Sequence, residues 1–203
     1  MKYKNIAYID TAALAGNYRA VAEKADDAQV IAVVKADAYG HGIACAASVL
    51  GDAGCTFFAV SSEEEAVELR RIERENGRPP SIIILGHIMP ENAREMADND
   101  IICTAVSYDN AVLLDRVMAG HPNKLTIHVK LDTGMNRVGF PTDDAHRAET
   151  VEKIRAVAGF GNLILGGIFT HFSCADTDLT AEDTGYTAMQ LERYRRTVDA
   201  LEE

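Results

Sequence analysis

Short apolar runs separated by segments with helical spacing constrain the fold of this chain more than any other feature. We predict a first strand at Lys4–Ile9 and six more at Val30–Val34, Phe57–Val60, Ile82–Leu85, Ile101–Val106, Leu125–Leu131 and Ile164–Phe172. Their apolar residues are continuous rather than alternating, which is typical of strands that a parallel sheet buries on both faces.

Between these runs, apolar residues recur at the spacing of helices. The predicted helices are Ala12–Lys24, Ile43–Leu50, one that starts after Ser62 and runs through Arg74, Pro90–Ala97, one from Ser107 to Met118, Thr142–Val157, and a last one from Thr180. Two overlapping capping boxes, Ser61-x-x-Glu64 and Ser62-x-x-Glu65, start the third helix. Its many Glu and Arg residues are interpreted as a solvated face.

Strands and helices that alternate at roughly 25 to 35 residues per unit indicate parallel strands joined by right-handed crossovers. An open doubly wound sheet and a (β/α)8 barrel both fit this order. No Gly-x-Gly-x-x-Gly follows the first strand, and polar residues gather at the ends of several strands, at Lys35, Ser61, His87, Lys130–Arg137 and His171. Catalytic groups have this distribution in barrels, so we predict an α/β fold of the (β/α)8 TIM type.

The strand count indicates that the barrel is incomplete. Closure needs eight strands, and six follow the N-terminal one. We therefore expect residues 1–203 to form one barrel domain that is truncated after about six strands. Its open edges, near Ile31–Val34 and Leu165–Phe169, would favour self-association.

Composition excludes several classes of function. The net charge is −11 and no Lys/Arg block occurs, which argues against nucleic acid and anionic membranes as partners. No run of 18 apolar residues and no signal-peptide pattern occurs, so we expect a cytoplasmic protein. The cysteines, Cys45, Cys55, Cys103 and Cys174, lack metal-ligand or disulfide-framework spacing, and no metal site is predicted.

Lys35 is the first candidate for chemistry, because it follows a buried strand directly. Removal from water favours the neutral amine, which is a nucleophile toward aldehydes, so Schiff-base chemistry is the natural use of such a lysine. Tyr39, Gly40 and Gly42 follow and predict a tight turn that leaves backbone amides free near the lysine. A purely structural lysine at a strand end is the alternative.

These residues carry a resemblance to a known family. The run 32–42, AVVKADAYGHG, resembles the pyridoxal 5'-phosphate (PLP) lysine motif of alanine racemases. By this resemblance, Lys35 bonds the cofactor and Tyr39 contacts its phosphate. Residues 132–139, DTGMNRVG, resemble the family motif whose arginine, here Arg137, donates to the cofactor's phenolate oxygen.

Two further residues are implied by the resemblance alone. His171, in Thr170-His171-Phe172, matches the histidine that packs on the cofactor ring. Lys130 matches a position that is carbamylated in some relatives and braces the arginine. Without the resemblance, Arg137 could equally form a salt bridge, and His171 could be structural.

The implied activity is racemisation of L- and D-alanine, with D-alanine supplied to the bacterial cell wall. Lys35 would serve one face of the amino-acid substrate, and a tyrosine from the C-terminal β-domain of a partner subunit would serve the other. That domain lies past residue 203, as do the family's pyridine-nitrogen arginine and phosphate-binding serine and glycines. We therefore expect a homodimer or other self-association, and no activity from residues 1–203 alone.

Three alternatives stay open from the sequence. The same scaffold could racemise serine, because the residues that select side-chain size are expected outside this chain. A single-barrel PLP-binding carrier also uses one barrel and one lysine, without racemase activity. A fragment that folds without binding any cofactor is the third.

Overall fold

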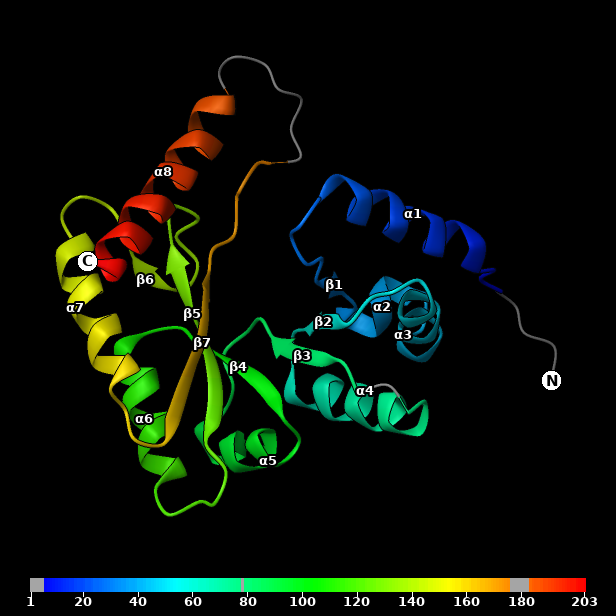
Figure 1. Cartoon of the computed structure of the whole chain (residues 1–203), viewed down its shortest axis with the longest axis horizontal. Coiled ribbons are helices and arrows are strands. Elements are labelled where there is room, and N and C mark those ends of the chain that lie inside the picture. Colours follow the sequence, from blue (N-terminus) through cyan, green and yellow to red (C-terminus); the bar gives the residue numbers. More distant parts are fainter. Residues whose placement is uncertain (1–5, 78, 176–182) are drawn as a thin grey trace. The chain divides into compact units, whose positions relative to one another are not determined.

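The computed structural model describes residues 6–77, 79–175 and 183–203, and it divides the chain into two compact units, residues 1–85 and 86–203 (Figure 1). In the described part of the chain, no helix combines the length and apolarity needed to cross a membrane.

The first unit alternates helices with short parallel strands. Its elements are α1 (Thr11–Lys24), β1 (Ala32–Val33), α2 (Lys35–Gly40), α3 (Ile43–Asp52), β2 (Phe57–Val60), α4 (Glu63–Glu75) and β3 (Ser81–Ile84). β2 is the central strand, paired in parallel with β1 on one side and β3 on the other. Phe58, Leu69 and the Ile82–Ile84 run are buried between the strands and the helices.

The second unit is built around the longest strand. Its elements are η1 (Pro90–Asn92), α5 (Ala93–Asp98), β4 (Ile101–Ala105), α6 (Tyr108–Met118), β5 (Leu125–Asp132), β6 (Phe140–Pro141), α7 (Arg147–Ala158), β7 (Leu163–Phe169) and α8 (Asp183–Glu202). β5 pairs in parallel with β4 and β7, and its last two residues pair with β6. The parallel alternation of strand and helix is thus confirmed within each unit.

Helix starts follow the side chains that the sequence supplies. The Asp10 side chain accepts from the Ala13 N–H at 2.9 Å and caps α1, and Ser107 accepts from the Asn110 N–H and caps α6. Ser62 caps α4 through the Glu65 N–H, so one of the two predicted capping boxes is present. An N-cap satisfies one of the four backbone donors that a helix leaves free at its start.

Two glycines in β7 make room for a half-buried histidine on β5. A Cβ at Gly166 would lie 2.9 Å from the Thr126 methyl carbon, and one at Gly167 would lie 2.9 Å from Cε1 of His128. A register shift between Ile127 and His128 marks the same place, and burial lowers the pKa of His128. Glycine in the interior of a strand is expected where another group approaches closely.

Several predicted boundaries were wrong. Residues 6–9 have no regular structure, and positions 4 and 5 of the predicted first strand lie outside the described residues. The lysine strand is only Ala32–Val33, and Val33 is 41% exposed rather than buried on both faces. The helix expected from Thr142 begins at Arg147, because the chain first forms the unpredicted strand β6. The start predicted at Thr180 lies outside the described residues.

The solvated face predicted for α4 is present, but two charged residues do not belong to it. The exposed members are Glu64, Glu68, Arg71, Arg74 and Glu75. Arg70 and Glu73 are both buried, and the Arg70 guanidinium donates to the Pro80 carbonyl at 2.7 Å. A long charged side chain is compatible with burial when its head group meets a carbonyl. The continuous burial expected for every strand holds for most of β2 and β3, whereas β5 alternates along its first half.

Candidate active site

Lys35 lies directly after the carboxyl end of β1, at the start of an unusual turn. The residues Ala36, Asp37, Ala38 and Tyr39 have φ between 51° and 55°, which makes α2 one turn of left-handed helix. Each non-glycine residue in this conformation costs about 1–2 kcal/mol. A backbone held in this way persists only where its surroundings fix it, and such strain concentrates at functional sites.

Glu65, on α4, fixes the start of that turn. Its carboxylate accepts from the Ala36 N–H at 2.5 Å and from the backbone and hydroxyl of Ser61 at 2.9 and 3.0 Å. Burial by itself raises the pKa of Glu65, but these hydrogen bonds outweigh it and hold the pKa below its ordinary value. The prediction of free backbone amides beside the lysine is therefore wrong for Ala36, whose N–H is bound by Glu65.

Asp37 fixes the other end of the turn. Its side chain accepts from the Ile43 N–H at 2.7 Å, and its carbonyl accepts from the Gly42 N–H at 2.9 Å. Gly40 and Gly42 both have φ near 85°, a conformation open to glycine. The tight turn predicted after Lys35 is thus present, with a handedness that the sequence did not reveal. Lys35 is half-buried, and Tyr39 is 63% exposed.

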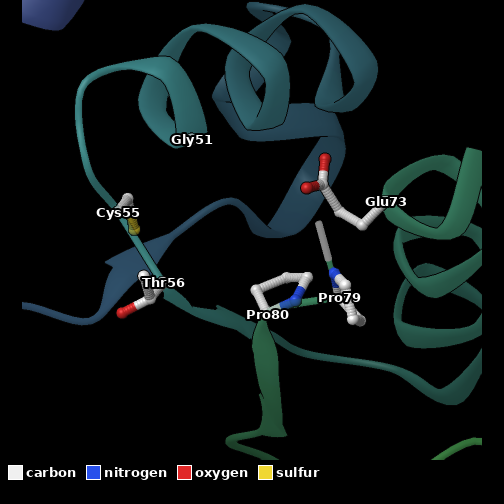
Figure 2. A pocket seen from close by; sticks show the side chains of 6 residues that line it. All are labelled: Gly51, Cys55, Thr56, Glu73, Pro79 and Pro80. Atoms are coloured by element: carbon white, nitrogen blue, oxygen red, sulfur yellow. The ribbon is translucent and has the colours of Figure 1, made fainter. Parts of the chain in front are cut away.

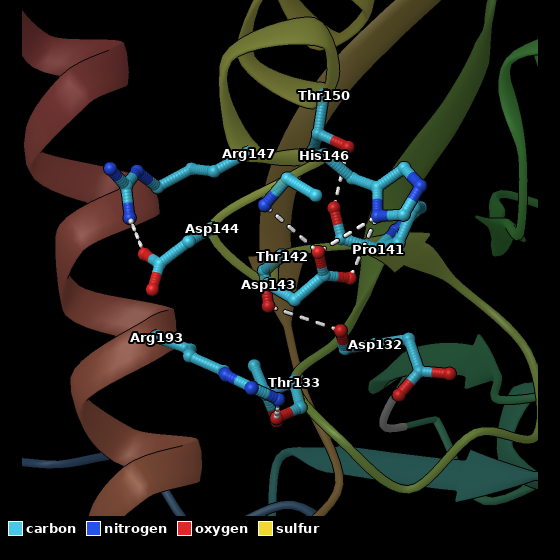
Figure 3. A network of polar contacts seen from close by, with 11 residues as sticks. Asp132, Thr133, Pro141, Thr142, Asp143, Asp144, His146, Arg147, Thr150 and Arg193 are labelled. Atoms are coloured by element: carbon cyan, nitrogen blue, oxygen red, sulfur yellow. Dashed lines mark hydrogen bonds and ion pairs between the residues drawn. The ribbon is translucent and has the colours of Figure 1, made fainter.

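Arg137 lies in the second unit, on the loop that joins β5 to β6. The Asp132 side chain accepts from the Gly134 and Asn136 N–H groups, both at 3.0 Å, and shapes the first half of this loop. At the far end of the loop, Thr142 donates from both its N–H and its hydroxyl to the carbonyl of Asp132, the last residue of β5 (Figure 3). The loop is therefore anchored at both ends, and Arg137 itself is exposed.

Lys130 is in β5, seven residues before Arg137, and it is only 2% exposed. Its Nζ lies 5.9 Å from the centre of the Phe169 ring of β7. Burial lowers the pKa of Lys130, Asp132 opposes this, and the positive charge of Arg137 adds to it. The amine of Lys130 therefore loses its proton at a lower pH than that of an exposed lysine.

His171 follows the carboxyl end of β7, after Thr170. Its backbone carbonyl accepts from Gln190 of α8 at 3.1 Å, and the residue is exposed. The same helix contacts the Arg137 loop, where Tyr186 donates to the Gly134 carbonyl at 2.6 Å. Arg193 of this helix donates to the Thr133 carbonyl at 3.1 Å (Figure 3).

The predicted site residues therefore fall into two sets. Lys35 and Tyr39 share the turn after β1 in the first unit, while Lys130, Arg137 and His171 lie at the carboxyl ends of β5 and β7 in the second. Both sets follow strand ends, where α/β folds place functional groups. Among the described residues, no group of three His, Cys, Asp or Glu side chains could hold a metal ion.

The first unit also contains a pocket of about 250 Å³, and it lies at the opposite ends of the strands (Figure 2). Thr56 and Pro80, which line it, directly precede β2 and β3, and the carboxylate of Glu73 lies beside it. Burial is the main reason for the raised pKa of the Cys55 thiol, another lining residue. Because functional groups gather at the carboxyl ends of parallel strands, this pocket is not the candidate site.

Sequence reasoning missed Glu65 and Gln190. The capping box identified Glu65 as a residue of the first helical turn, but nothing in the local pattern indicated its bond to Ala36, 29 residues away. Gln190 lies in the predicted last helix, and no local signal marked it for burial.

The family of alanine racemase N-terminal domains matches residues 9–203 of this chain. An alanine racemase from Desulforamulus reducens is 37% identical over 175 residues, which are 86% of this chain and 44% of that protein. Among solved structures, an alanine racemase from Clostridium difficile 630 matches with a TM-score of 0.80 and 31% identity, covering 95% of this chain and 47% of its own.

A structure titled histidine racemase, from Leuconostoc mesenteroides subsp. sake, matches equally well, with a TM-score of 0.80, 30% identity, and coverage of 91% of this chain and 46% of its own. The chain spans about half the length of the relatives it matches. These matches confirm the predicted class of fold as well as the resemblance, and the chain belongs to the family of alanine racemase N-terminal domains.

Proposed function

We propose that this chain is the cofactor-binding part of a PLP-dependent alanine racemase. One observation carries the proposal: Lys35 and Tyr39 lie in a strained, fully anchored turn at a strand end, in a chain matched to the family over residues 9–203. The substrate is a small amino acid, and the protein acts as a homodimer in the cytoplasm, where D-alanine serves cell-wall synthesis.

The donor groups of the chain fit PLP. An aldehyde needs a primary amine, a phosphate needs hydroxyl or amide donors, and a phenolate oxygen needs a cation. Lys35, the exposed Tyr39 hydroxyl and the exposed Arg137 guanidinium supply these groups, and His171 offers a ring for packing. When bound, PLP withdraws electrons from the α-carbon of an amino acid joined to it and so makes the Cα proton acidic.

Each residue then has a separate task. Lys35 would hold the cofactor and would move the Cα proton on one face of the substrate. Inversion needs a second base on the opposite face, because a single base that returned the proton to its own face would preserve the configuration. Arg137, with its permanently charged guanidinium, would hold the phenolate oxygen of the cofactor.

Reductive trapping tests the assignment of Lys35. After incubation with PLP and reduction with borohydride, we expect the cofactor on the peptide that contains Lys35 in the wild type, and no stable label in Lys35→Ala. The control Lys24→Ala removes an exposed lysine of α1 and should retain the label. A label on any other lysine of the wild type would contradict the assignment.

Racemisation by the complete gene product tests the activity. We expect D-alanine to form from L-alanine, and Lys35→Ala to lower the rate by about 10²–10⁴-fold, the usual contribution of acid–base catalysis. L-Serine and L-histidine should be assayed beside L-alanine, because a solved relative is titled histidine racemase. Cofactor binding without inversion of any of these amino acids would instead indicate a PLP carrier.

A further inference from the structure

Gln190 of α8 is a fully buried amide whose three hydrogen bonds all reach two separate segments. Its Nε2 donates to the Thr133 hydroxyl at 3.2 Å and to the His171 carbonyl at 3.1 Å, and its Oε1 accepts from the Ser173 N–H at 2.9 Å. Neither segment belongs to its own helix. A buried amide whose N–H and C=O groups are both hydrogen-bonded restrains the groups that it joins. If one of these bonds were broken, the buried partner would keep the desolvation cost that the bond offsets.

The bond to Thr133 continues into a directed chain of hydroxyl groups. The Thr170 hydroxyl donates to the Leu131 carbonyl at 3.0 Å, so in its contact of 2.8 Å with Thr133 it is the acceptor. Thr133 must then donate to Thr170 and accept from Gln190. The order of donors is fixed from α8 through the end of β5 to the end of β7, and Thr133 is itself fully buried.

The two segments joined by Gln190 are the ones that carry proposed cofactor ligands. Thr133 starts the loop that presents Arg137, and the stretch from Thr170 to Ser173 includes His171. We propose that Gln190 is a positioning residue that sets the spacing of these two segments and thereby the relative placement of Arg137 and His171. The consequence for cofactor binding rests on the proposed function, whereas the restraint itself does not.

Amide hydrogen exchange measures the restraint without any cofactor. In Gln190→Leu, whose new side chain has a similar volume and no polar atoms, we expect peptides covering 133–140 and 170–174 to exchange about tenfold faster or more, while β4 and β5 stay protected. The matched control is Thr197→Val. Thr197 is buried in the same helix, and its hydroxyl donates only within α8, to the Arg193 carbonyl. Unchanged exchange of both segments in Gln190→Leu would overturn the proposal.

Gln190→Glu separates positioning from simple loss of packing. A protonated glutamic acid can donate to the His171 carbonyl, whereas a carboxylate would face that carbonyl as a second acceptor. We expect exchange of the two segments to be near that of the wild type at about pH 5 and to approach that of Gln190→Leu at about pH 8, because burial raises a carboxyl pKa. If the two segments of Gln190→Glu exchanged faster than those of the wild type by the same factor at both pH values, a hydrogen-bonded role would be contradicted. This test holds even if Gln190→Leu fails to fold.

Titration with PLP then tests the link to function. We expect Gln190→Leu to weaken PLP binding by about 10-fold or more and Thr197→Val to leave it unchanged, since small misplacements of binding groups have large effects. Faster exchange with unchanged PLP affinity would overturn the effect of Gln190 on the cofactor ligands. Absence of PLP binding by the wild type would instead refute the proposed function and leave the exchange result standing.

Discussion

Single residues already show how the fold prepares its polar groups for chemistry. Glu65 and Asp37 supply acceptors for the left-handed turn after Lys35. The strain of that turn is offset by two hydrogen bonds, one to the Glu65 carboxylate of α4 and one to the Asp37 carboxylate within the turn itself. In the second unit, the surroundings of Lys130 prepare its amine for chemistry. The side chain is buried, and both burial and Arg137 disfavour its positive charge.

We expect Lys130 to be carbamylated. Carbon dioxide reacts with the neutral amine, and a lowered pKa means that Lys130 reaches this form at a lower pH than an exposed lysine does. With ¹³C-labelled bicarbonate, a carbamate signal should appear by NMR, grow as pH rises, and be absent in Lys130→Met. The control Lys124→Met, at an exposed lysine beside β5, should keep the signal. A wild type without the signal would refute the expectation.

At the scale of elements, the return from β5 to β6 depends on one glycine. Gly139 has φ of +130°, and a Cβ there would lie 2.8 Å from both the Asp132 nitrogen and the Lys130 carbonyl oxygen. Both atoms are backbone and cannot move aside without disturbing β5. The close approach of the Arg137 loop to β5 at this position therefore requires glycine.

Gly139→Ala should lower the free energy of unfolding by about 2–5 kcal/mol, the sum of left-handed strain and overpacking. Urea unfolding measures this as a lower midpoint. Gly161→Ala is the control, since a Cβ there meets nothing within 4 Å, and its effect should stay within about 0.5 kcal/mol. Equal midpoints for the two variants would show that the loop adapts to the added methyl group.

At the scale of the whole molecule, two strands have exposed apolar side chains. β1 is paired with β2 within its unit, and Val33 on it is 41% exposed, while Ile164 on β7 is 48% exposed. Unpaired strand edges with apolar side chains favour association with other chains.

Residues 1–203 should therefore self-associate in solution, as measured by light scattering. Val33→Lys and Ile164→Lys should each shift the chain toward the monomer, because a charge on an edge strand opposes pairing. Val21→Lys, at an exposed valine of α1, is the control and should leave the association unchanged. A monodisperse wild-type monomer would contradict this expectation.

The sequence by itself determined the elements whose signals are local. The apolar runs located β2, β3 and β4, Ser107 located the start of α6, and the lysine and arginine motifs indicated the family. These predictions succeeded because side-chain periodicity and caps act within a few residues.

Only the tertiary structure decided the features that depend on distant partners. The left-handed turn after Lys35 contradicts local preference and depends on Glu65, which is 29 residues away. Gln190 reaches Thr133 across 57 residues, and Arg70 is buried because the Pro80 carbonyl meets its guanidinium. No local pattern encodes such contacts, since hydrogen-bond partners far apart in the sequence meet only after the strands and helices have packed.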